Sequence, residues 1–273
     1  MSAGRGKQPR AKLAAHPEPA RSLFVNSLQK GFAVLKAFSR ERPRLTLAQI
    51  TKITGLDKSA AQRFLYTLHE LGFITKDEET KQYSLSAKIL EFAYTYLYSD
   101  PIIERAQPFL VEVHEKTGET VNLAVLDGSD IILISRIPSR HVLSTNIQIG
   151  FRLPAIYSAS GRVIAALLPQ AERERLLDES AYVAYTPNTV IDRKRIRQLI
   201  QQAAADGYAM VESQVISADI SAAAPVIDGS GRVVAAVSMS VPNTRMKFAE
   251  AKRLFVPAVV EAARKISVAL GAF

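Results

Sequence analysis

The chain of 273 residues contains no cysteine and no tryptophan. The absence of cysteine excludes disulfide bonds and thiolate metal sites, and it is typical of proteins in a reducing compartment. Long apolar runs are also absent, and the first twenty residues carry charges and prolines where a signal peptide needs an apolar segment. We therefore expect a cytoplasmic protein without a membrane segment.

Motifs of the common enzyme classes are missing as well. The sequence has no Walker loop, no dinucleotide-binding glycine pattern and no His-Glu zinc motif, and its four histidines show no metal-ligand spacing. A serine hydrolase that uses Ser160 stays an alternative, because catalytic triads form in space. The YSASGR segment, however, lacks the glycine that stands two residues before a nucleophile-elbow serine. We expect no catalytic residues, no metal and no cofactor.

Positive charge is unevenly distributed along the chain. The formal net charge is +9, and residues 1–100 hold 16 Lys and Arg against nine Asp and Glu, whereas residues 101–273 hold 19 against 17. A basic N-terminal part suggests DNA as its partner, because neutralisation of phosphates supplies most non-specific affinity. Residues 1–21 contribute part of the excess, and their Ala, Pro, Lys and Arg content predicts a disordered basic tail.

Residues 22–86 show the pattern of a winged helix-turn-helix domain. A first helix over residues 26–40 is predicted from apolar residues that recur on one face, namely Leu28, Phe32, Leu35 and Phe38. Thr46 caps a second helix, and a short turn that contains glycine leads into a third. Two short strands around a charged turn, residues 73–75 and 82–85, then form the wing.

The third helix, residues 57–72, is the segment expected to contact DNA. Asp57 can cap its first turn and Gly72 can end it, while an apolar face is formed by Ala61, Phe64, Leu65, Leu68 and Leu71. Taken alone, this is the pattern of an ordinary amphipathic helix, and the neighbouring elements favour DNA contact. The predicted DNA-binding residues are Thr46, Lys58, Ser59, Gln62, Arg63, Tyr66, Lys76 and Lys81.

Residues 87–100 predict a linker helix that is apolar or aromatic nearly all round, which favours either dimerisation or packing against its own domains. Residues 101–273 then mix helices with strands. They include a hairpin at Asp127-Gly128, a strand over residues 141–149, and a long final helix over residues 247–270. Such a mixture around a mostly antiparallel sheet predicts an α+β regulatory domain.

From about residue 22 to its end the chain resembles the IclR family of bacterial transcriptional regulators. The segments that carry the resemblance are NSLQKGFAVL, LTLAQITKITGLDKSAAQRFLYTLHELGFI, AVLDGSDIILISRIPSR, IGFRLPAIYSASGRVIAALL, AAAPVID and VVAAVSMSVP. The NSLQKG opening and the RIPSRHVLSTNIQIGFRLPA stretch look most like the branch that controls aromatic-acid and β-ketoadipate catabolism. The resemblance implies an N-terminal winged helix-turn-helix, a C-terminal GAF-like domain that binds a small organic acid, and a homodimer or homotetramer on a double-stranded DNA operator with palindromic half-sites.

The resemblance also implies an effector site where the YSASGR helix begins. The residues that it points to are Ala159, Ser160, Gly161, Glu212, Ser221, Ser238 and Ser240. Hydroxyls and free N–H groups at a helix start can hold a carboxylate, and Ser238 and Ser240 share one strand face. Each serine is equally compatible with a small polar core residue. The possible charged partners of an acidic ligand are Arg136, Arg140 and Arg152, although positions at the surface or at a dimer contact are favoured for all three.

Two departures from the family pattern lie at this site. The helix start reads YSASGR where the branch more often has Thr-Ser-Met-Gly-Arg, and VISADISAAAP replaces a commoner Gly-Leu-Arg-Ser run. The effector is therefore expected to differ from that of relatives. An architectural DNA-binding protein without an effector is the alternative function.

Overall fold

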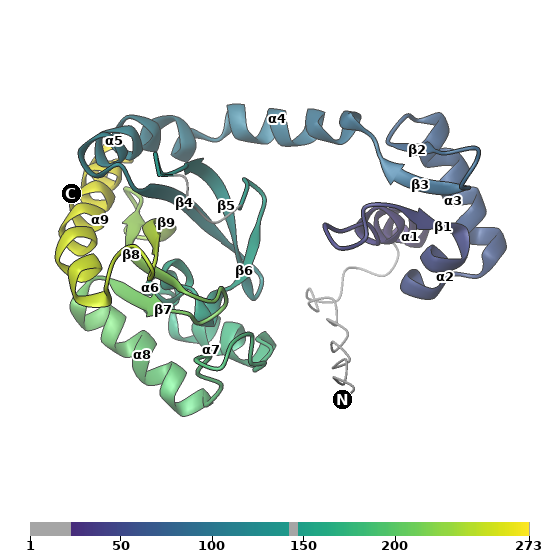
Figure 1. The fold of residues 1–273 in the computed structure, drawn as a ribbon. Coiled ribbons are helices and arrows are strands. Elements are labelled where there is room, and N and C mark those ends of the chain that lie inside the picture. Colours follow the sequence, from purple (N-terminus) through teal and green to yellow (C-terminus); the bar gives the residue numbers. More distant parts are fainter. Residues whose placement is uncertain (1–22, 142–146, 273) are drawn as a thin grey trace. The chain divides into compact units, whose positions relative to one another are not determined.

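The computed structural model describes residues 23–141 and 147–272, so the predicted tail, residues 1–21, lies outside the described residues. The chain divides into two compact units, Met1–Leu97 and Tyr98–Phe273 (Figure 1). Each unit has its own hydrophobic core.

The N-terminal unit combines three helices with a small antiparallel sheet in which the strand order is β1-β3-β2. Its elements are α1 (Asn26–Lys36), β1 (Leu45–Thr46), α2 (Leu47–Thr54), α3 (Lys58–Glu70), β2 (Ile74–Lys76) and β3 (Gln82–Leu85). This is a winged helix-turn-helix, as the sequence predicts. The two-residue strand β1 has no signal of its own, because it exists only through its pairing with β3.

Local caps fix the two helices of the helix-turn-helix. Thr46 accepts a hydrogen bond from the Gln49 N–H, and the Gln49 side chain accepts one from the Thr46 N–H, which makes a capping box. Gly55 ends α2 at a φ of 74°, and Asp57 begins α3 by accepting from the Ala60 N–H at 2.8 Å. These contacts account for the boundaries that the sequence predicts for α3.

The first helix differs from its prediction. It ends at Lys36, and it buries Val34, while Leu28 and Phe32 are exposed by 60% and 54%. Leu71 of the third helix is also exposed, since it follows the last helical turn. The core instead gathers residues from α1, α2, α3 and the small sheet, namely Val34, Ala37, Phe38, Leu45, Ile50, Leu65, Leu68 and Ile74.

The linker is a short 3-10 turn, η1 (Ala87–Ile89), followed by α4 (Leu90–Ser99), where the sequence predicts one helix. No residue of α4 is buried within the chain, and Leu90 and Phe92 are exposed by 66% and 65%. Phe92 stacks on Phe73 with ring centroids 5.5 Å apart. Helix α4 therefore carries apolar surface that the described residues of this chain do not cover.

The C-terminal unit is built on a six-stranded antiparallel sheet with the order β6-β5-β4-β9-β8-β7. The strands are β4 (Thr120–Asp127), β5 (Asp130–Ile137), β6 (Arg152–Pro154), β7 (Ala209–Glu212), β8 (Asp219–Ile227) and β9 (Val233–Pro242). The helices are α5 (Pro101–Thr117), η2 (Ala155–Tyr157), α6 (Ala159–Leu167), α7 (Gln170–Glu179), α8 (Arg193–Asp206) and α9 (Phe248–Ala269). The α+β fold class predicted from the sequence is confirmed.

The strand predicted over residues 141–149 lies mostly outside the described residues, which do not include residues 142–146. Its remaining residues, 141 and 147–149, form no strand. The edge strand β6 follows instead and pairs with the start of β5, with Leu153 opposite Ile131. Such a three-residue edge strand depends on its neighbour for register, so sequence periodicity does not reveal it.

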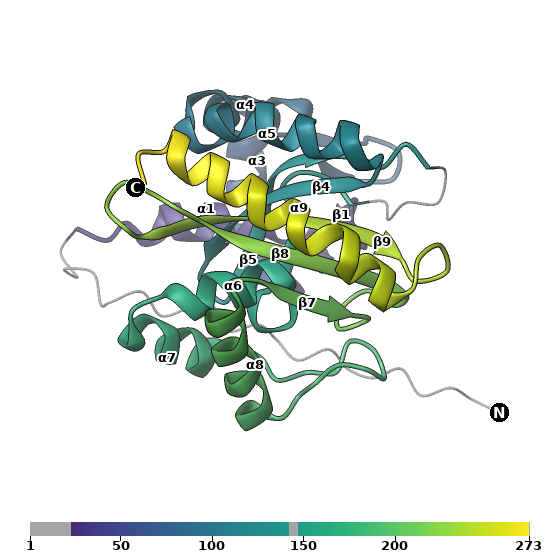
Figure 2. The same ribbon diagram turned by 90° about the vertical axis from the view of Figure 1, so that its left-hand side faces the viewer.

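Helices cover both faces of the large sheet. Helices α5 and α9 lie on one face, and α6, α7 and α8 lie on the other (Figures 1 and 2). Alternate residues along a strand point to opposite faces. In β9, Val237 and Met239 therefore pack toward α9, which leaves Ser238 and Ser240 on the α6 face.

Candidate effector cavity and DNA-contacting surface

A cavity of about 60 Å³ lies between the first turn of α6 and the facing strands. Its apolar wall includes Ile131, Leu133, Leu153 and Val211. Its polar lining comes from β4, β5, β8, β9, the loop after β7 and the start of α6, with the residues Asn122, Arg136, Ser158, Ser160, Ser213, Gln214, Asp219, Ser221, Ser238 and Ser240. A few polar groups within a partly apolar cavity are typical of a small-molecule site.

Strand register places the polar side chains of the sheet side by side. Ser240 pairs with Ser221 across β9 and β8, and Ser238 pairs with Asn122 across β9 and β4. Asn122 in turn pairs with Arg136 of β5, and the Arg136 Nη1 donates to the Asn122 Oδ1 at 2.8 Å. The sheet thus presents hydroxyls, an amide and a guanidinium to one ligand.

Arg136 and Asp219 are the charged groups of the cavity. Burial raises the pKa of the Asp219 carboxyl to about 7, and the positive charge of Arg136 partly opposes this rise. Burial lowers the pKa of Arg136, and the charge of Asp219 partly opposes that change. Near neutral pH the cavity therefore holds a cation beside a carboxyl group that is close to its titration midpoint.

The start of α6 supplies hydrogen-bond donors to the cavity. Ser158 caps the helix, and its Oγ accepts from the Gly161 N–H at 3.0 Å. The first N–H groups of a helix have no partner within it, so the amides of Ala159 and Ser160 can bind an anion where the helix dipole is favourable. Both residues line the cavity.

Gly161 lets this first turn approach η2. A Cβ atom at Gly161 would lie 2.2 Å from the Ala155 carbonyl oxygen and 2.4 Å from its Cα atom. Any side chain would therefore push the start of α6 away from the cavity wall. Gly161 acts on the site through this close packing, and it does not line the cavity.

The other residues predicted for the site divide in the same way. Ala159, Ser160, Ser221, Ser238 and Ser240 line the cavity. Glu212 does not, because its neighbour Val211 points inward and adjacent strand residues face opposite sides. The Glu212 carboxylate instead accepts from the Asn243 side chain at 3.2 Å.

Of the three arginines considered from the sequence, Arg136 alone lines the cavity. Arg140 is exposed beyond the end of β5. Arg152 bonds to Asp127 at 2.6 Å and to Asp130 at 3.0 Å across the hairpin turn. The latter two arginines are therefore removed from the expected set of effector contacts.

Sequence reasoning missed Asn122, Gln214 and Asp219. Asp219 begins β8, a strand of mostly small residues, and a carboxyl group at the start of such a strand was the feature that could have indicated a site residue. Asn122 and Gln214 carry no local signal. They reach the cavity through the pairing of β4 and through the loop that follows β7.

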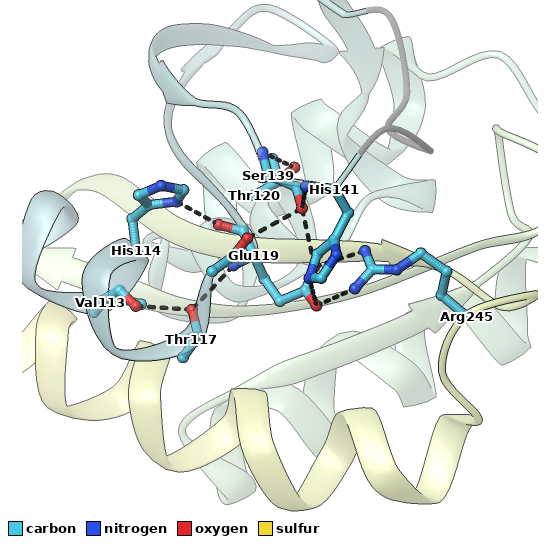
Figure 3. Close-up of polar contacts among 9 residues, drawn as sticks. Val113, His114, Thr117, Glu119, Thr120, Ser139, His141 and Arg245 are labelled. Carbon is cyan, nitrogen blue, oxygen red and sulfur yellow. Dashed lines mark hydrogen bonds and ion pairs between the residues drawn. The ribbon is translucent and has the colours of Figure 1, made fainter.

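A buried ion pair between Glu119 and Arg245 connects segments at one end of the sheet (Figure 3). Glu119 is 3% exposed, and its two carboxylate oxygens accept from Arg245 at 3.0 and 2.6 Å. Ser139 donates to the same carboxylate at 3.4 Å, and the His141 Nε2 lies 3.8 Å from it. This cluster joins the start of β4, the segment after β5 and the turn before α9.

The N-terminal unit presents a polar face on α3. Lys58, Ser59, Gln62, Arg63 and Tyr66 are all exposed, and Tyr66 is exposed by 65%. Within residues 23–141 and 147–272, their side chains make no hydrogen bond or ion pair with another residue. This face is thus available to bases and phosphates.

The wing lysines are already paired. Lys76 and Lys81 bind the Glu78 carboxylate at 2.7 and 3.1 Å. Hydrogen bonding to Glu78 raises the pKa of Lys76. Glu78 thus neutralises part of the positive charge that the wing could offer to phosphates.

Within the described ranges, no three His, Asp or Glu side chains gather as a metal site would require. Among the same residues, no helix combines the length and the apolar character needed to span a bilayer.

Comparison with known proteins identifies both units. The model of the IclR helix-turn-helix domain matches residues 27–78, and that of the bacterial transcriptional regulator IclR C-terminal domain matches residues 94–268. The chain belongs to the IclR family. It is a ligand-responsive DNA-binding transcriptional regulator and not an enzyme, so the serine-hydrolase alternative is set aside.

Two relatives are similar to this chain over most of their length. The Pca regulon regulatory protein of Pseudomonas putida is 34% identical over 89% of this chain and 83% of the relative. The p-hydroxybenzoate hydroxylase transcriptional activator of Acinetobacter baylyi is 27% identical over 85% of this chain and 89% of the relative.

A solved IclR homologue shares the fold. The protein of Microbacterium hydrocarbonoxydans, complexed with 4-hydroxybenzoate, aligns with a TM-score of 0.73 at 24% identity, and the alignment covers 89% of this chain and 98% of that one. The resemblance stated from the sequence is confirmed at the level of the family.

Proposed function

We propose that this regulator controls genes for the catabolism of an aromatic or related organic acid, and that the acid itself is the effector. The observation that carries the proposal is the α6 cavity, where two helix-start amides, Arg136 and several hydroxyls converge. The carboxylate would accept from the amides of Ala159 and Ser160, and Ser238 and Ser240 would bind a second polar group. The names of the two curated relatives support an aromatic acid.

Cavity size bears on the identity of the acid. The cavity measures about 60 Å³, whereas a buried site that accepts benzene measures about 150 Å³. An aromatic acid therefore requires the walls to move apart, and a short aliphatic acid requires less movement. Such an expansion is a direct way for a ligand to select one conformation of the domain, because the ligand then binds the two conformations with different affinity.

On the DNA side, we propose that α3 contacts the operator in the major groove. Arg63 and Gln62 would read bases, while Lys58 and Ser59 would contact phosphates near the helix start and Tyr66 would extend the same face. Thr46, Lys76 and Lys81 would add contacts to the backbone. The wing lysines must then exchange Glu78 for phosphate. The protein would do this in the cytoplasm, where the chromosome of a bacterium lies.

We further propose that the functional unit is a homodimer, or a tetramer made of two such dimers, on palindromic half-sites. The exposed apolar side chains of α1 and α4 support this, because contiguous apolar surface on a single chain marks an interaction site. A two-fold dimer places two α3 helices on half-sites that are separated by about one helical turn or a multiple of it. Effector binding would act by changing this spacing.

The experiment that tests the effector role is a thermal-shift screen of the full chain with aromatic and short dicarboxylic acids. A ligand that binds the folded state stabilises it by mass action, so an effector should raise the melting temperature. Arg136→Gln should remove the shift, and the matched control Arg140→Gln, outside the cavity, should keep it. If no acid gives a shift while the protein still binds its operator, the architectural alternative is favoured.

A further inference from the structure

A second cavity, of about 180 Å³, lies on the far side of α6 from the effector cavity, between α6, α8, β7 and the start of α9. Its apolar wall includes Leu199, Met210 and Phe248, and its cationic groups are Arg162 and Lys252. None of its residues lines the effector cavity. Its volume is sufficient for a benzene-sized body, which needs about 150 Å³.

Arg162 is the unusual residue of this cavity. It is 4% exposed, its Nε donates to the Ile156 carbonyl oxygen at 2.9 Å, and its buried Nη2 has no hydrogen-bond partner among the described residues. Burial and the nearby charge of Arg195 lower the pKa of Arg162 to about 10, so the guanidinium stays positive at neutral pH.

No carboxylate compensates this charge. Within the part of the chain that the structure describes, Arg162 forms no ion pair. Asp206 lines the same cavity and accepts a hydrogen bond from Gln202 at 2.8 Å, and among the described residues no ion pair joins it to Arg162. A buried and uncompensated cation is costly for the folded state, and an anion bound beside it would offset that cost.

Lys252 adds a second cation at the rim. It is exposed, and its Nζ lies 5.9 Å from the centre of the Tyr208 ring. Among the described residues it has no carboxylate within ion-pair distance. A carboxylate between Arg162 and Lys252 would therefore meet two positive groups, while an attached apolar body would face Leu199 and Phe248.

We propose that this cavity is a second binding site for a small organic acid, with the carboxylate held by Arg162 and Lys252 and an apolar body packed against α8 and the start of α9. A planar guanidinium suits a carboxylate because it can donate two parallel hydrogen bonds. The site does not depend on the proposed effector cavity. Both sites border α6, since Ala159 and Ser160 face one and Arg162 faces the other.

The direct test is a crystal structure of the full chain with 4-bromobenzoate, in which anomalous scattering locates the bromine. We expect a bromine site beside Leu199 and Phe248, and we expect 4-bromobenzamide, which has the same shape without the charge, to leave it empty. Bromine only in the effector cavity, or equal occupancy by the amide, would overturn the proposal. Bromine only in the second cavity would contradict the proposed effector site and support this one.

Calorimetric titration with 4-bromobenzoate provides the solution measurement. Lys252→Gln should weaken one of the binding events about two- to fivefold, which is the range for a partly exposed ion pair. Arg162→Met should weaken the same event about 30-fold or more, because the lost charge is buried. Arg253→Gln removes an exposed charge on the next residue of α9 and should change nothing. If Arg162→Met does not fold, an unchanged titration of Lys252→Gln is sufficient to overturn the proposal.

Discussion

Asp219 is the residue whose charge state most affects the effector cavity. Its pKa in the folded protein is raised to about 7 from an ordinary value of 3.8, chiefly by burial. The folded state therefore holds this proton more tightly than the unfolded state does. The stabilisation that results is complete below about pH 4 and is lost as the pH rises to about 7.

Asp219→Asn should remove this pH dependence. We expect the variant to lose less stability than the parent between pH 4 and pH 7, as measured by thermal unfolding of the C-terminal unit.

The affinity for the effector should also depend on the protonation of Asp219, because an ionised Asp219 repels a carboxylate ligand and a neutral Asp219 does not. Titrations at pH 6 and pH 8 should show tighter binding at pH 6 for the parent and a smaller difference for Asp219→Asn. Equal differences in the two proteins would exclude this role.

At Gly161, the space available beside the backbone determines which residue can be accommodated. Gly161→Ala should destabilise the C-terminal unit by about 1–3 kcal/mol, because its Cβ would overlap the backbone of Ala155. The matched control is Gly31→Ala in α1, where the nearest atom to a Cβ is 3.8 Å away. There the helix propensity of alanine should stabilise the N-terminal unit by roughly 0.5–1 kcal/mol. Scanning calorimetry measures the stability change in both variants. An unchanged stability of Gly161→Ala would contradict the close packing of Gly161 against Ala155.

Single residues of the cavity were predictable where a local rule or the family resemblance applies. The resemblance pointed to Ser160 at the start of α6, and strand alternation was enough to place Ser238 and Ser240 on one face. Arg136 was expected at the surface because its inward direction depends on the irregular register between β4 and β5, where Leu123 pairs with Ser135 and Ala124 with Leu133. A bulge of this kind changes which residues face inward, and the alternation of apolar and polar residues in the sequence does not reveal it.

At the scale of the element, α3 is the part of the molecule that should discriminate between DNA sequences. Arg63→Ala should weaken binding to the operator by about 1–3 kcal/mol and weaken binding to random DNA much less, if Arg63 reads a base. Lys58→Ala should weaken both more evenly, because a phosphate contact carries no sequence information. Fluorescence anisotropy at one fixed salt concentration measures the ratio. Equal losses on both DNAs for Arg63→Ala would assign Arg63 to the backbone.

Helix bounds were predictable where residues at the ends of the helix favour its start and its termination. Helix α3 has Asp57 and Gly72 at its ends, so its bounds are close to the prediction. Strands β1 and β6 are short and exist through pairing with β3 and β5. Those pairings join distant parts of the chain, and a local pattern does not encode them.

At the scale of the whole molecule, large apolar side chains of α1 and α4 are exposed to solvent in the described part of the single chain. Leu28 lies on the apolar face predicted for the first helix, yet it is 60% exposed and does not belong to the core of the N-terminal unit. An amphipathic pattern specifies that a face must be buried and does not specify by which chain. The proposed second copy of the protein would cover the exposed side chains of α1 and α4, in keeping with the proposed use of two half-sites.

Leu28→Asp and Leu90→Asp should both convert the protein to a monomer, because each places a charge on surface that the proposed dimer buries. Sedimentation velocity measures the change. A monomer binds two half-sites separately, so affinity for the full operator should fall at least about 100-fold while affinity for an isolated half-site is kept. Ile191→Asp is the matched control, since Ile191 is exposed by 52% in the segment before α8. Dimers that persist in both variants would show that the interface lies elsewhere, and a similar loss in Ile191→Asp would show that the effect is not specific to α1 and α4.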